Sequence, residues 1–320
     1  MKTIIFFNNK GGVGKTTTVY HIAWMMSELG LKVLAVDLDP QCNLSSMFLP
    51  NERMEELILE ENGNTILDSI APISEGEPYK PVYIESINHN ISLLVGNLAL
   101  SSFEDKLSDA WSKCLGGDSF AFKVTSVFKT MINDASERIQ ADFVLIDVGP
   151  NLGAMNRSIL ITTDNIVIPV APDLFSLQGI KNLGDTLKEW RWQWDKRKQE
   201  YRKADISSIP NGRMQPIGYI VMQYSAKDSR PVKSYLKWAD KIPLVYEQYV
   251  NGTNNSQQDD VDRLALLKHY HSLAPMSMEA HKPIFLLKPV DGAIGAHLQS
   301  VSRCYVDFKQ LTQKIISKSL

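Results

Sequence analysis

The chain has 320 residues, a formal net charge of −2, 44% hydrophobic residues and 22% charged residues. These values are ordinary for a globular protein in water, with room for one large α/β domain or two small ones. The charge excludes a molecule that is basic as a whole, so any contact with nucleic acid would have to come from a local basic face. The three cysteines lie far apart with no C-x-x-C spacing, which indicates neither a disulfide framework nor a zinc site.

The N-terminus predicts a buried strand and not a signal peptide. A short apolar run at 4–7 ends at Asn8, and a glycine-rich loop follows at once. No stretch of the sequence approaches the ~20 apolar residues that a transmembrane helix requires. We therefore expect a cytoplasmic protein with reduced thiols.

Residues 10–17, Lys-Gly-Gly-Val-Gly-Lys-Thr-Thr, lie between this strand and a predicted helix at 16–30. The order is typical of a phosphate-binding loop, although Asn9 stands where the G-x-x-x-x-G-K-[ST] pattern has its first glycine. Backbone N–H groups of such a loop converge on phosphate oxygens at a helix N-terminus, which disfavours the alternative of a turn that binds nothing. The residues expected to hold the nucleotide are Lys10, Gly11, Gly12, Val13, Gly14, Lys15, Thr16 and Thr17.

Two side chains of this loop have separate expected tasks. Lys15 would reach the β- and γ-phosphates, and the Thr16 hydroxyl would take a place on Mg²⁺. The sequence thus predicts ATP and Mg²⁺ as the nucleotide and the metal.

The next strand, predicted at 33–36, runs into the sequence Asp37-Leu-Asp39-Pro-Gln-Cys-Asn-Leu-Ser. A strand, phosphate loop, helix and second strand place phosphates at the carboxyl edge of a parallel sheet. Aspartates at that edge would face the γ-phosphate and Mg²⁺. Aspartates also commonly cap strand-to-helix turns, but the loop upstream favours the functional interpretation.

Further along the chain, residues 50–80 are less regular and predict a helix with surface loops. At 144–146 an apolar run ends in Asp147 and a Gly/Pro turn, a pattern in which the carboxylate holds Mg²⁺ through water. The polar residues 251–260 predict a loop. The other predicted elements are strands at 91–95, 166–170, 217–222 and 284–287, and helices at 152–163, 176–203 and 293–318.

The loop K-G-G-V-G-K-T, with its second lysine at Lys10, resembles the deviant Walker A loop of the ParA/MinD family of P-loop ATPases. The D-x-D-P-Q box, with Cys42 in place of the usual glycine, and the segment around Asp147, with Gly149 before Pro150, are similar to the same family. The likeness covers roughly 1–50, 90–240 and 275–318. It implies an α/β fold with a doubly wound, mostly parallel sheet flanked by helices. It also implies one P-loop ATPase domain over 1–320, with expanded loops near 50–80 and 188–212.

The resemblance assigns roles to particular residues. It implies that Lys10 reaches across a nucleotide-sandwich homodimer to the partner's phosphates, where a cation stabilises the transferring phosphoryl group. It implies that Asp39 positions the attacking water, so that Lys10, Lys15 and Asp39 are the expected catalytic residues. Thr16, Asp37 and Asp147 are the expected metal residues. Gln223 and, less strongly, Pro289 are the expected adenine contacts.

The family resemblance implies a Mg²⁺-dependent ATPase that serves DNA partition or cargo positioning. Such an ATPase binds DNA without sequence preference, associates with the nucleoid and answers to a stimulatory adaptor protein. Residues 188–203 carry seven Lys/Arg against three acids, interleaved with aromatic residues that could contact DNA. The alternative is a helix whose Trp190 and Trp194 pack inward from one face, with Trp192 lying away from it. Candidate DNA-binding cations on the closing helix are Arg303, Lys309, Lys314 and Lys318.

Three other classes of protein use the same ATPase fold. A MinD-like membrane ATPase would dock an amphipathic C-terminal helix on lipid, but the stripe Val301, Tyr305, Phe308, Leu311 and Ile315 is more typical of a helix packed on its own sheet. A small-molecule kinase remains an alternative, and Asp39 as a water-positioning group disfavours it. An iron–sulfur ATPase is excluded because no cysteine lies near Val148.

Overall fold

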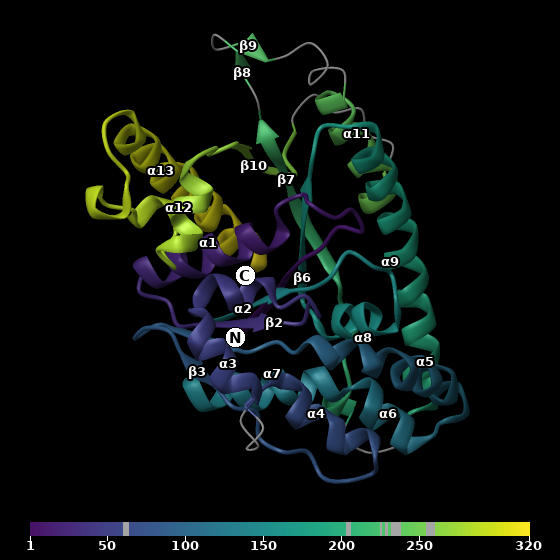
Figure 1. Cartoon of the computed structure of the whole chain (residues 1–320). Coiled ribbons are helices and arrows are strands. Elements are labelled where there is room, and N and C mark those ends of the chain that lie inside the picture. Colours follow the sequence, from purple (N-terminus) through teal and green to yellow (C-terminus); the bar gives the residue numbers. More distant parts are fainter. Residues whose placement is uncertain (60–63, 203–205, 225, 228–229, 232–237, 254–259) are drawn as a thin grey trace.

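The computed structural model describes the chain except residues 60–63, 203–205, 225, 228–229, 232–237 and 254–259. Its centre is an eight-stranded sheet in the order β10-β7-β6-β1-β5-β2-β4-β3 (Figure 1). The neighbouring pairs from β10 through β4 are parallel, and β3 pairs antiparallel with β4 at the other edge. The strands are β1 (Lys2–Phe6), β2 (Val33–Asp37), β3 (Glu85–Ser86), β4 (Ile91–Leu94), β5 (Phe143–Asp147), β6 (Asn165–Val170), β7 (Gln215–Tyr224) and β10 (Arg263–Lys268).

The strands in the middle of the sheet are buried on both faces, which is why they appear in the sequence as continuous apolar runs. All residues of β2, β5 and β6 are buried. One hydrophobic core gathers residues of α4 to α9 on one face of the sheet, and a second gathers residues of α1 to α3 and α13 on the other. The fold is therefore the doubly wound α/β sheet that the sequence predicts.

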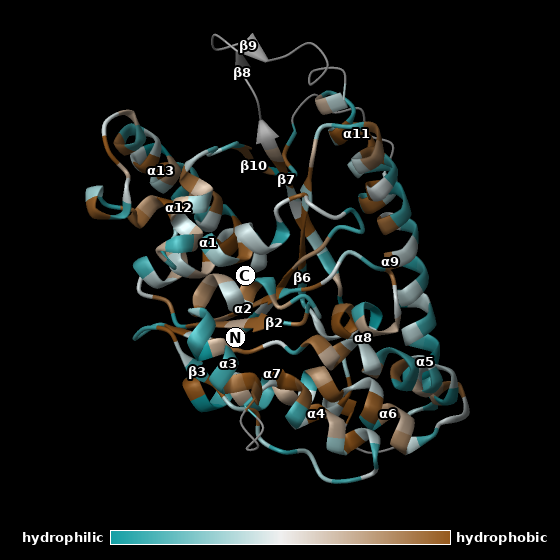
Figure 2. Ribbon diagram, viewed as in Figure 1, coloured by the Kyte–Doolittle hydropathy of each residue, from teal (hydrophilic) through white to brown (hydrophobic). Residues whose placement is uncertain are grey.

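The helices flank this sheet on both sides. Figure 2 shows hydrophobic residues concentrated on the strands and on the helix faces turned toward them. The helices are α1 (Lys15–Glu28), α2 (Asn43–Phe48), α3 (Asn51–Leu59), α4 (Ile66–Ser74), α5 (Glu104–Lys113), α6 (Ser119–Thr125), α7 (Val127–Ile139), α8 (Ala154–Thr162), α9 (Leu174–Glu200), α11 (Ile242–Tyr246), α12 (Leu273–Glu279) and α13 (Ala296–Ser319).

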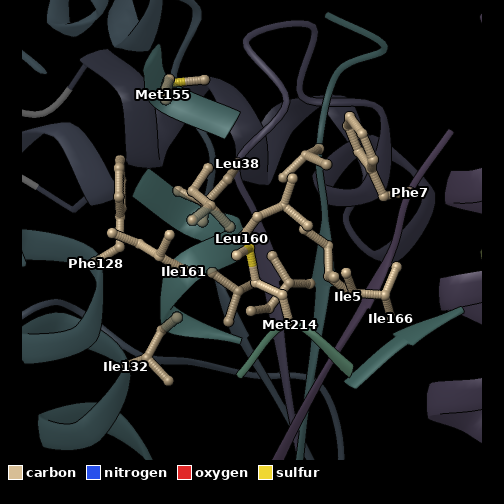
Figure 3. Packing of buried hydrophobic residues seen from close by; sticks show 14 of the residues in the cluster. Ile5, Phe7, Leu38, Phe128, Ile132, Met155, Leu160, Ile161, Ile166 and Met214 are labelled. Atoms are coloured by element: carbon tan, nitrogen blue, oxygen red, sulfur yellow. The ribbon is translucent and has the colours of Figure 1, made fainter. Parts of the chain in front are cut away.

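The core under β1 and β6 fixes the phosphate edge of the sheet in place. Ile5 lies beside Ile166 of β6, and Phe7, Leu160 and Ile161 belong to the same buried cluster (Figure 3). These side chains are fully buried. Because β1 ends at Phe6, this packing holds the start of the phosphate loop rigidly against the sheet.

The last predicted strand is wrong. The structure has a 3₁₀ helix, η5 (Ile284–Leu286), where the sequence predicts a strand at 284–287. Ile284 and Phe285 are buried, and the Ile284 N–H donates to Nε2 of His21 on α1 at 3.1 Å. The apolar run is therefore an anchor for α1 and not a sheet element. The strand that completes the sheet is β10, in which Leu264 and Leu267 are buried and whose pairing with β7 is irregular.

The polar segment predicted as a loop at 251–260 lies partly outside the described residues. Its first residue ends a π-helical turn, η4 (Glu247–Asn251).

Candidate nucleotide-binding site

The phosphate loop leaves β1 at Phe6 and enters α1 at Lys15. Gly12 and Gly14 take φ values of 72° and 78°, in the left-handed region that glycine adopts without strain. A Cβ on Gly14 would lie 2.7 Å from Cε of Met222, so the end of β7 packs directly against the loop. The Thr18 hydroxyl, one turn into α1, contacts the Met222 sulfur at 3.8 Å.

Lys15 lies folded back over the loop and is 7% exposed. Its Nζ donates to the carbonyls of Asn8 and Lys10 at 3.3 and 3.4 Å. Burial lowers the pKa of this amine, and the nearby carboxylates of Asp147 and Asp39 counteract part of that shift. A buried ammonium with only two long bonds to carbonyls is suited to receive an anion.

Asp147 ends β5 between two neighbouring strands. It pairs in register with Phe6 of β1 and with Asp37 of β2. Its side chain is fully buried, and neither carboxylate oxygen has a hydrogen bond of good geometry among the described residues, although the Thr16 hydroxyl lies close enough to influence its pKa. Burial raises the pKa of Asp147 well above its usual range and the Asp37 charge adds to this, while the Thr16 hydroxyl and Lys15 oppose it. An orphaned buried carboxylate beside a threonine hydroxyl is a donor set that fits Mg²⁺.

The two aspartates after β2 have different surroundings. Asp37 is fully buried, and its Oδ2 accepts from the N–H and hydroxyl of Ser45, both at 2.7 Å. Burial raises the pKa of Asp37 to about 6, although the Ser45 bonds lower it. Asp39 is 8% exposed, and its Oδ1 accepts from the N–H of Gln41 at 3.0 Å. Asp37 therefore connects α2 to the sheet edge through Ser45, and Asp39 follows it in the loop that leads to α2.

Cys42 stands at a position that favours glycine. It takes a φ of 53° at the N-terminus of α2, in the left-handed region. Burial raises the pKa of its thiol to about 12, and the charges of Asp37 and Asp39 add to the shift. The thiol is therefore neutral and packs as a small apolar group.

The loop after β5 is held by two side chains outside it. The Asn156 amide donates to the carbonyls of Gly149 and Asn151 at 2.8 and 2.7 Å. The Glu104 carboxylate of α5 caps the N-terminus of α8, accepting from Ala154 and, at 2.9 Å, from Met155. A Cβ on Gly149 would lie 3.4 Å from Oδ1 of Asp39, so this loop faces Asp39 closely.

Lys10 makes an ion pair with Asp173 of the same chain. Asp173 is also the N-cap of α9, accepting from the Ser176 N–H at 2.9 Å. Burial alone would raise the pKa of Asp173, but Lys10 and the Ser176 N–H hold it below its usual range. The sequence analysis missed Asp173. An aspartate directly before a predicted helix is the N-cap signal that could have found it.

The predicted adenine residues lie on separate elements. Gln223 belongs to β7 next to Met222, but its side chain lies outside the described residues. Pro289 is exposed at the start of a 3₁₀ turn, η6 (Pro289–Asp291). The structure brings the end of β7 to the phosphate loop, and both adenine contacts stay predictions.

Two sequence features that were considered for DNA and membrane binding place residues in the core of the fold. Trp190 and Trp194 of α9 are buried and Trp192 is 62% exposed, as the helical spacing predicts. The stripe on α13 is also turned inward: Val301, Phe308, Leu311 and Ile315 are buried in the core that α1 shares. Within the described ranges, no helix combines the length and apolar character needed to span a bilayer.

Comparison with known proteins agrees with this geometry. Residues 1–199 match the AAA domain family. The chain belongs to this family and is a P-loop ATPase of the ParA/MinD type.

Relatives of this ATPase include partition proteins. It is 29% identical over 233 residues to an uncharacterized protein of Methanocaldococcus jannaschii, an alignment that covers 73% of this chain and 77% of the relative. It is 29% identical over 188 residues to the chromosome-partitioning ATPase Soj of Treponema pallidum, covering 58% of this chain and 64% of Soj. The matched part is thus less than two thirds of Soj.

Solved structures share the whole fold. Protein DIP2308 of Corynebacterium diphtheriae has a TM-score of 0.71 at 26% identity, covering 88% of this ATPase and 97% of that chain. A putative plasmid partition protein of Borrelia burgdorferi, solved with bound AMPPNP, has a TM-score of 0.63 at 16% identity over 99% of both chains. The second likeness is one of fold alone.

Proposed function

We propose that this chain is a Mg²⁺-dependent ATP hydrolase that dimerises with nucleotide between its subunits and drives DNA partition or cargo positioning through non-specific DNA binding. One observation carries the proposal: Lys15 and Asp147, two buried ionisable groups close enough to influence each other's pKa, lie at the sheet edge beside the glycine-rich loop. In this proposal residues 1–320 act as one ATPase domain.

The phosphate-binding steps belong to the loop and to α1. The backbone N–H groups of 11–17 and the Lys15 ammonium would bind the phosphates of ATP. The Thr16 hydroxyl and the Asp147 carboxylate would hold Mg²⁺, which neutralises developing charge on the phosphate oxygens when bound. Asp37 would support this region indirectly, because its oxygens are bonded to Ser45 and to the Asp39 N–H.

Water activation belongs to Asp39 in this proposal. Its Oδ1 is fixed by Gln41, and Oδ2 would orient the attacking water toward the γ-phosphate. Asn156 and Gly149 keep the loop after β5 close to that carboxylate. Hydrolysis would be slow, so the ATP-bound dimer would persist as a timer.

Lys10 would complete the site of the second subunit. In this chain Lys10 forms an ion pair with Asp173. The Lys10 side chain is 30% exposed and the Asp173 side chain is 36% exposed. An exposed ion pair contributes only about 0–1 kcal/mol, so the phosphates of a partner-bound ATP could displace Asp173 easily. The ion pair of Lys10 with Asp173 would therefore break when the dimer forms.

DNA contact would come from exposed cations and not from the core of 188–203. Arg191, Arg197 and Lys198 of that segment donate to backbone carbonyls of this chain. Lys188 and Lys196 are exposed cations of that segment, and α13 adds Arg303, Lys309 and Lys314, with Lys318 partly engaged by the Val261 carbonyl. An adaptor protein would stimulate hydrolysis, and the site of action would be the cytoplasm at the nucleoid. The buried α13 stripe gives no support to membrane docking.

The test uses Asp39→Ala, which should bind ATP and accumulate as a dimer. Binding to random-sequence duplex DNA is measured with ATP, ADP and no nucleotide over a salt series. We expect ATP-dependent binding that weakens steeply with salt because phosphate contacts release counterions. Lys15→Ala is the matched control, since it should lose nucleotide affinity, the dimer and DNA binding together.

Three results would count against the proposal. Normal hydrolysis by Asp39→Ala would remove that residue from its role. Wild-type ATP affinity in Lys15→Ala would overturn the phosphate-loop assignment. A confirmed ATP-bound dimer that binds no DNA at low salt would exclude non-specific DNA as the partner.

A further inference from the structure

A cavity of about 230 Å³ lies between the loop that joins β10 to α12 and the first turns of α13. These elements form the yellow-green part of Figure 1, beside α1. The cavity is separate from the phosphate loop, and of the predicted functional residues only the candidate DNA cation Arg303 lines it. Its polar lining includes Lys268, His269, His271, His297, Ser300 and Arg303.

Two histidines of the loop are oriented by a backbone bond. His271 takes a φ of 42°, an uncommon conformation for a residue with a side chain. Its N–H donates to Nδ1 of His269 at 2.9 Å, and the two rings lie 4.5 Å apart. Because Nδ1 of His269 accepts, its Nε2 carries the hydrogen and is a donor. The strained loop therefore presents an imidazole donor in a fixed orientation.

His297 brings a ring nitrogen that lacks a partner. It lies in the first turn of α13, and its Nε2 contacts the Ser272 hydroxyl at 3.1 Å. Its Nδ1 is enclosed and has no hydrogen-bond partner among the described residues. Leaving such a group unpaired costs about 1–3 kcal/mol, and in the tautomer whose Nε2 accepts from Ser272 the Nδ1 carries the hydrogen and is a donor that an oxygen atom would satisfy. The N-terminal turn of a long helix adds a preference for an anion.

The fixed charges of the cavity favour an anion as well. Lys268 and Arg303 are exposed cations, and Asp307 is the acid in the lining. The Asp307 carboxylate already accepts from the Tyr270 hydroxyl at 3.0 Å. His297, Ser300 and Arg303 follow each other at three-residue spacing, so they share one face of α13. A molecule with a net charge of −2 thus gathers cations and donors around one cavity.

We propose that this cavity binds a phosphate group, through Arg303, Lys268 and the histidine donors. The volume accommodates a phosphate with several waters of about 30 Å³ each. The phosphate could be a backbone phosphodiester of nucleic acid or a free phosphate. Only the phosphodiester source rests on the proposed DNA binding, while the phosphate site itself is independent of the ATPase.

The experiment follows the imidazole resonances of nucleotide-free protein by long-range ¹H–¹⁵N NMR. The chain has six histidines, so His89 and His281 serve as internal controls, whereas His21 contacts the Thr17 carbonyl of the phosphate loop and is not used as one. Inorganic phosphate is titrated at constant pH and ionic strength. We expect shifts at His269, His271 and His297 that saturate, with no matching change at the controls. Arg303→Gln should weaken phosphate binding about tenfold, because it removes a charge-assisted hydrogen bond.

Lys309→Gln is the matched variant, since it removes one cation from the same helix but does not line the cavity. It should leave the phosphate titration unchanged. A second arm replaces phosphate with a short random duplex and uses Asp39→Ala bound to ATP, because the proposed DNA binding is ATP-dependent. Shifts of the same three residues that compete with phosphate identify the phosphodiester, and phosphate shifts without duplex shifts identify a free phosphate.

Two outcomes would overturn the proposal. One is the absence of saturable shifts at the three cavity histidines. The other is an equal effect of Arg303→Gln and Lys309→Gln, which would show a diffuse electrostatic response and not a site. His297→Asn gives an independent check, because it should also weaken binding while Arg303 is intact.

Discussion

Two regions of this molecule that contain buried charged residues differ in their surroundings. At the sheet edge, Asp147 has no hydrogen bond of good geometry among the described residues, and Lys15 has only two long bonds to carbonyls. Where α5 meets α8 and α9, Arg197 is buried to a similar degree, but its guanidinium makes short hydrogen bonds and an aromatic contact. It donates to the carbonyls of Trp111 and Gln193 at 2.7 and 3.0 Å and lies 4.1 Å from the Trp111 ring.

The difference separates charges that build the fold from charges that await a ligand. Arg197 shares the Trp111 surface with Arg157, and Glu104 caps α8 nearby. Arg197 and Glu104 thus satisfy polar groups of the folded chain itself, while the Nε of Arg157 has no hydrogen-bond partner among the described residues. Asp147 and Lys15 lack such well-formed hydrogen bonds within the chain, and a buried polar group without partners reduces stability. The comparison predicts opposite effects on stability when the two kinds of charge are removed.

The largest expected effect is the loss of Arg197. Arg197→Ala should lower the free energy of unfolding by about 3 kcal/mol, because two bonds to charged nitrogen and the contact with Trp111 disappear. Urea unfolding followed by tryptophan fluorescence measures this directly. The neighbouring Lys196→Ala, an exposed cation near Trp192, should change stability by less than about 0.5 kcal/mol. Equal effects of the two variants would contradict the structural role of Arg197.

Asp147 should behave in the opposite way. Asp147→Asn should raise the free energy of unfolding by about 1–2 kcal/mol at neutral pH, because it removes an unpaired buried charge, while ATP hydrolysis is lost. The pKa of Asp147 is raised in the folded state. The unfolded state therefore releases this proton at a lower pH than the folded state does. The wild type loses stability as pH rises from the unfolded-state pKa, about 4, through the folded one.

The advantage of Asp147→Asn should thus be small near pH 4 and grow as pH rises. Urea unfolding at a series of pH values tests this, with the exposed Asp240→Asn as the control that shows no such trend. A variant that is less stable than the wild type at neutral pH would show that Asp147 is a structural charge after all.

The smallest expected effect concerns the ion pair between Lys10 and Asp173. Asp173→Asn keeps an N-cap for α9 but removes the anionic partner of Lys10. Stability should change by less than about 1 kcal/mol, and ATP-dependent dimer affinity should rise about 2–5-fold because Lys10 is released. Analytical ultracentrifugation with ATP measures this. Asp185→Asn, exposed on the same helix, is the control, and an unchanged dimer affinity in Asp173→Asn would show that the pair restrains nothing.

Local patterns were enough to predict much of the fold and the centre of the site. The apolar runs that became β1, β2, β5, β6 and β7 are continuous because both faces of those strands are covered. Motif spacing placed Lys15, Thr16 and Asp147 at one sheet edge, where the structure has them. The roles of the individual site residues, including Asp39 and Lys10 in the partner's site, stay predictions.

The errors arose where tertiary contacts decide the structure. The run at 284–287 has the composition of a strand, but Ile284 and Phe285 are needed to pack under α1. β10 was missed because Leu264 and Leu267 are its buried residues and exposed cations stand at both ends. Glu104 could not be found from sequence, since it lies 50 residues from the helix that it caps.

One contact of the phosphate loop concerns how such loops change over time. Asn9 occupies the position of the missing first glycine, and a Cβ on Gly179 of α9 would lie 2.8 Å from its Oδ1. The empty space that the usual motif keeps inside the loop is therefore provided by a helix 170 residues away. Substitutions at 9 and 179 should accordingly be inherited together and not one at a time.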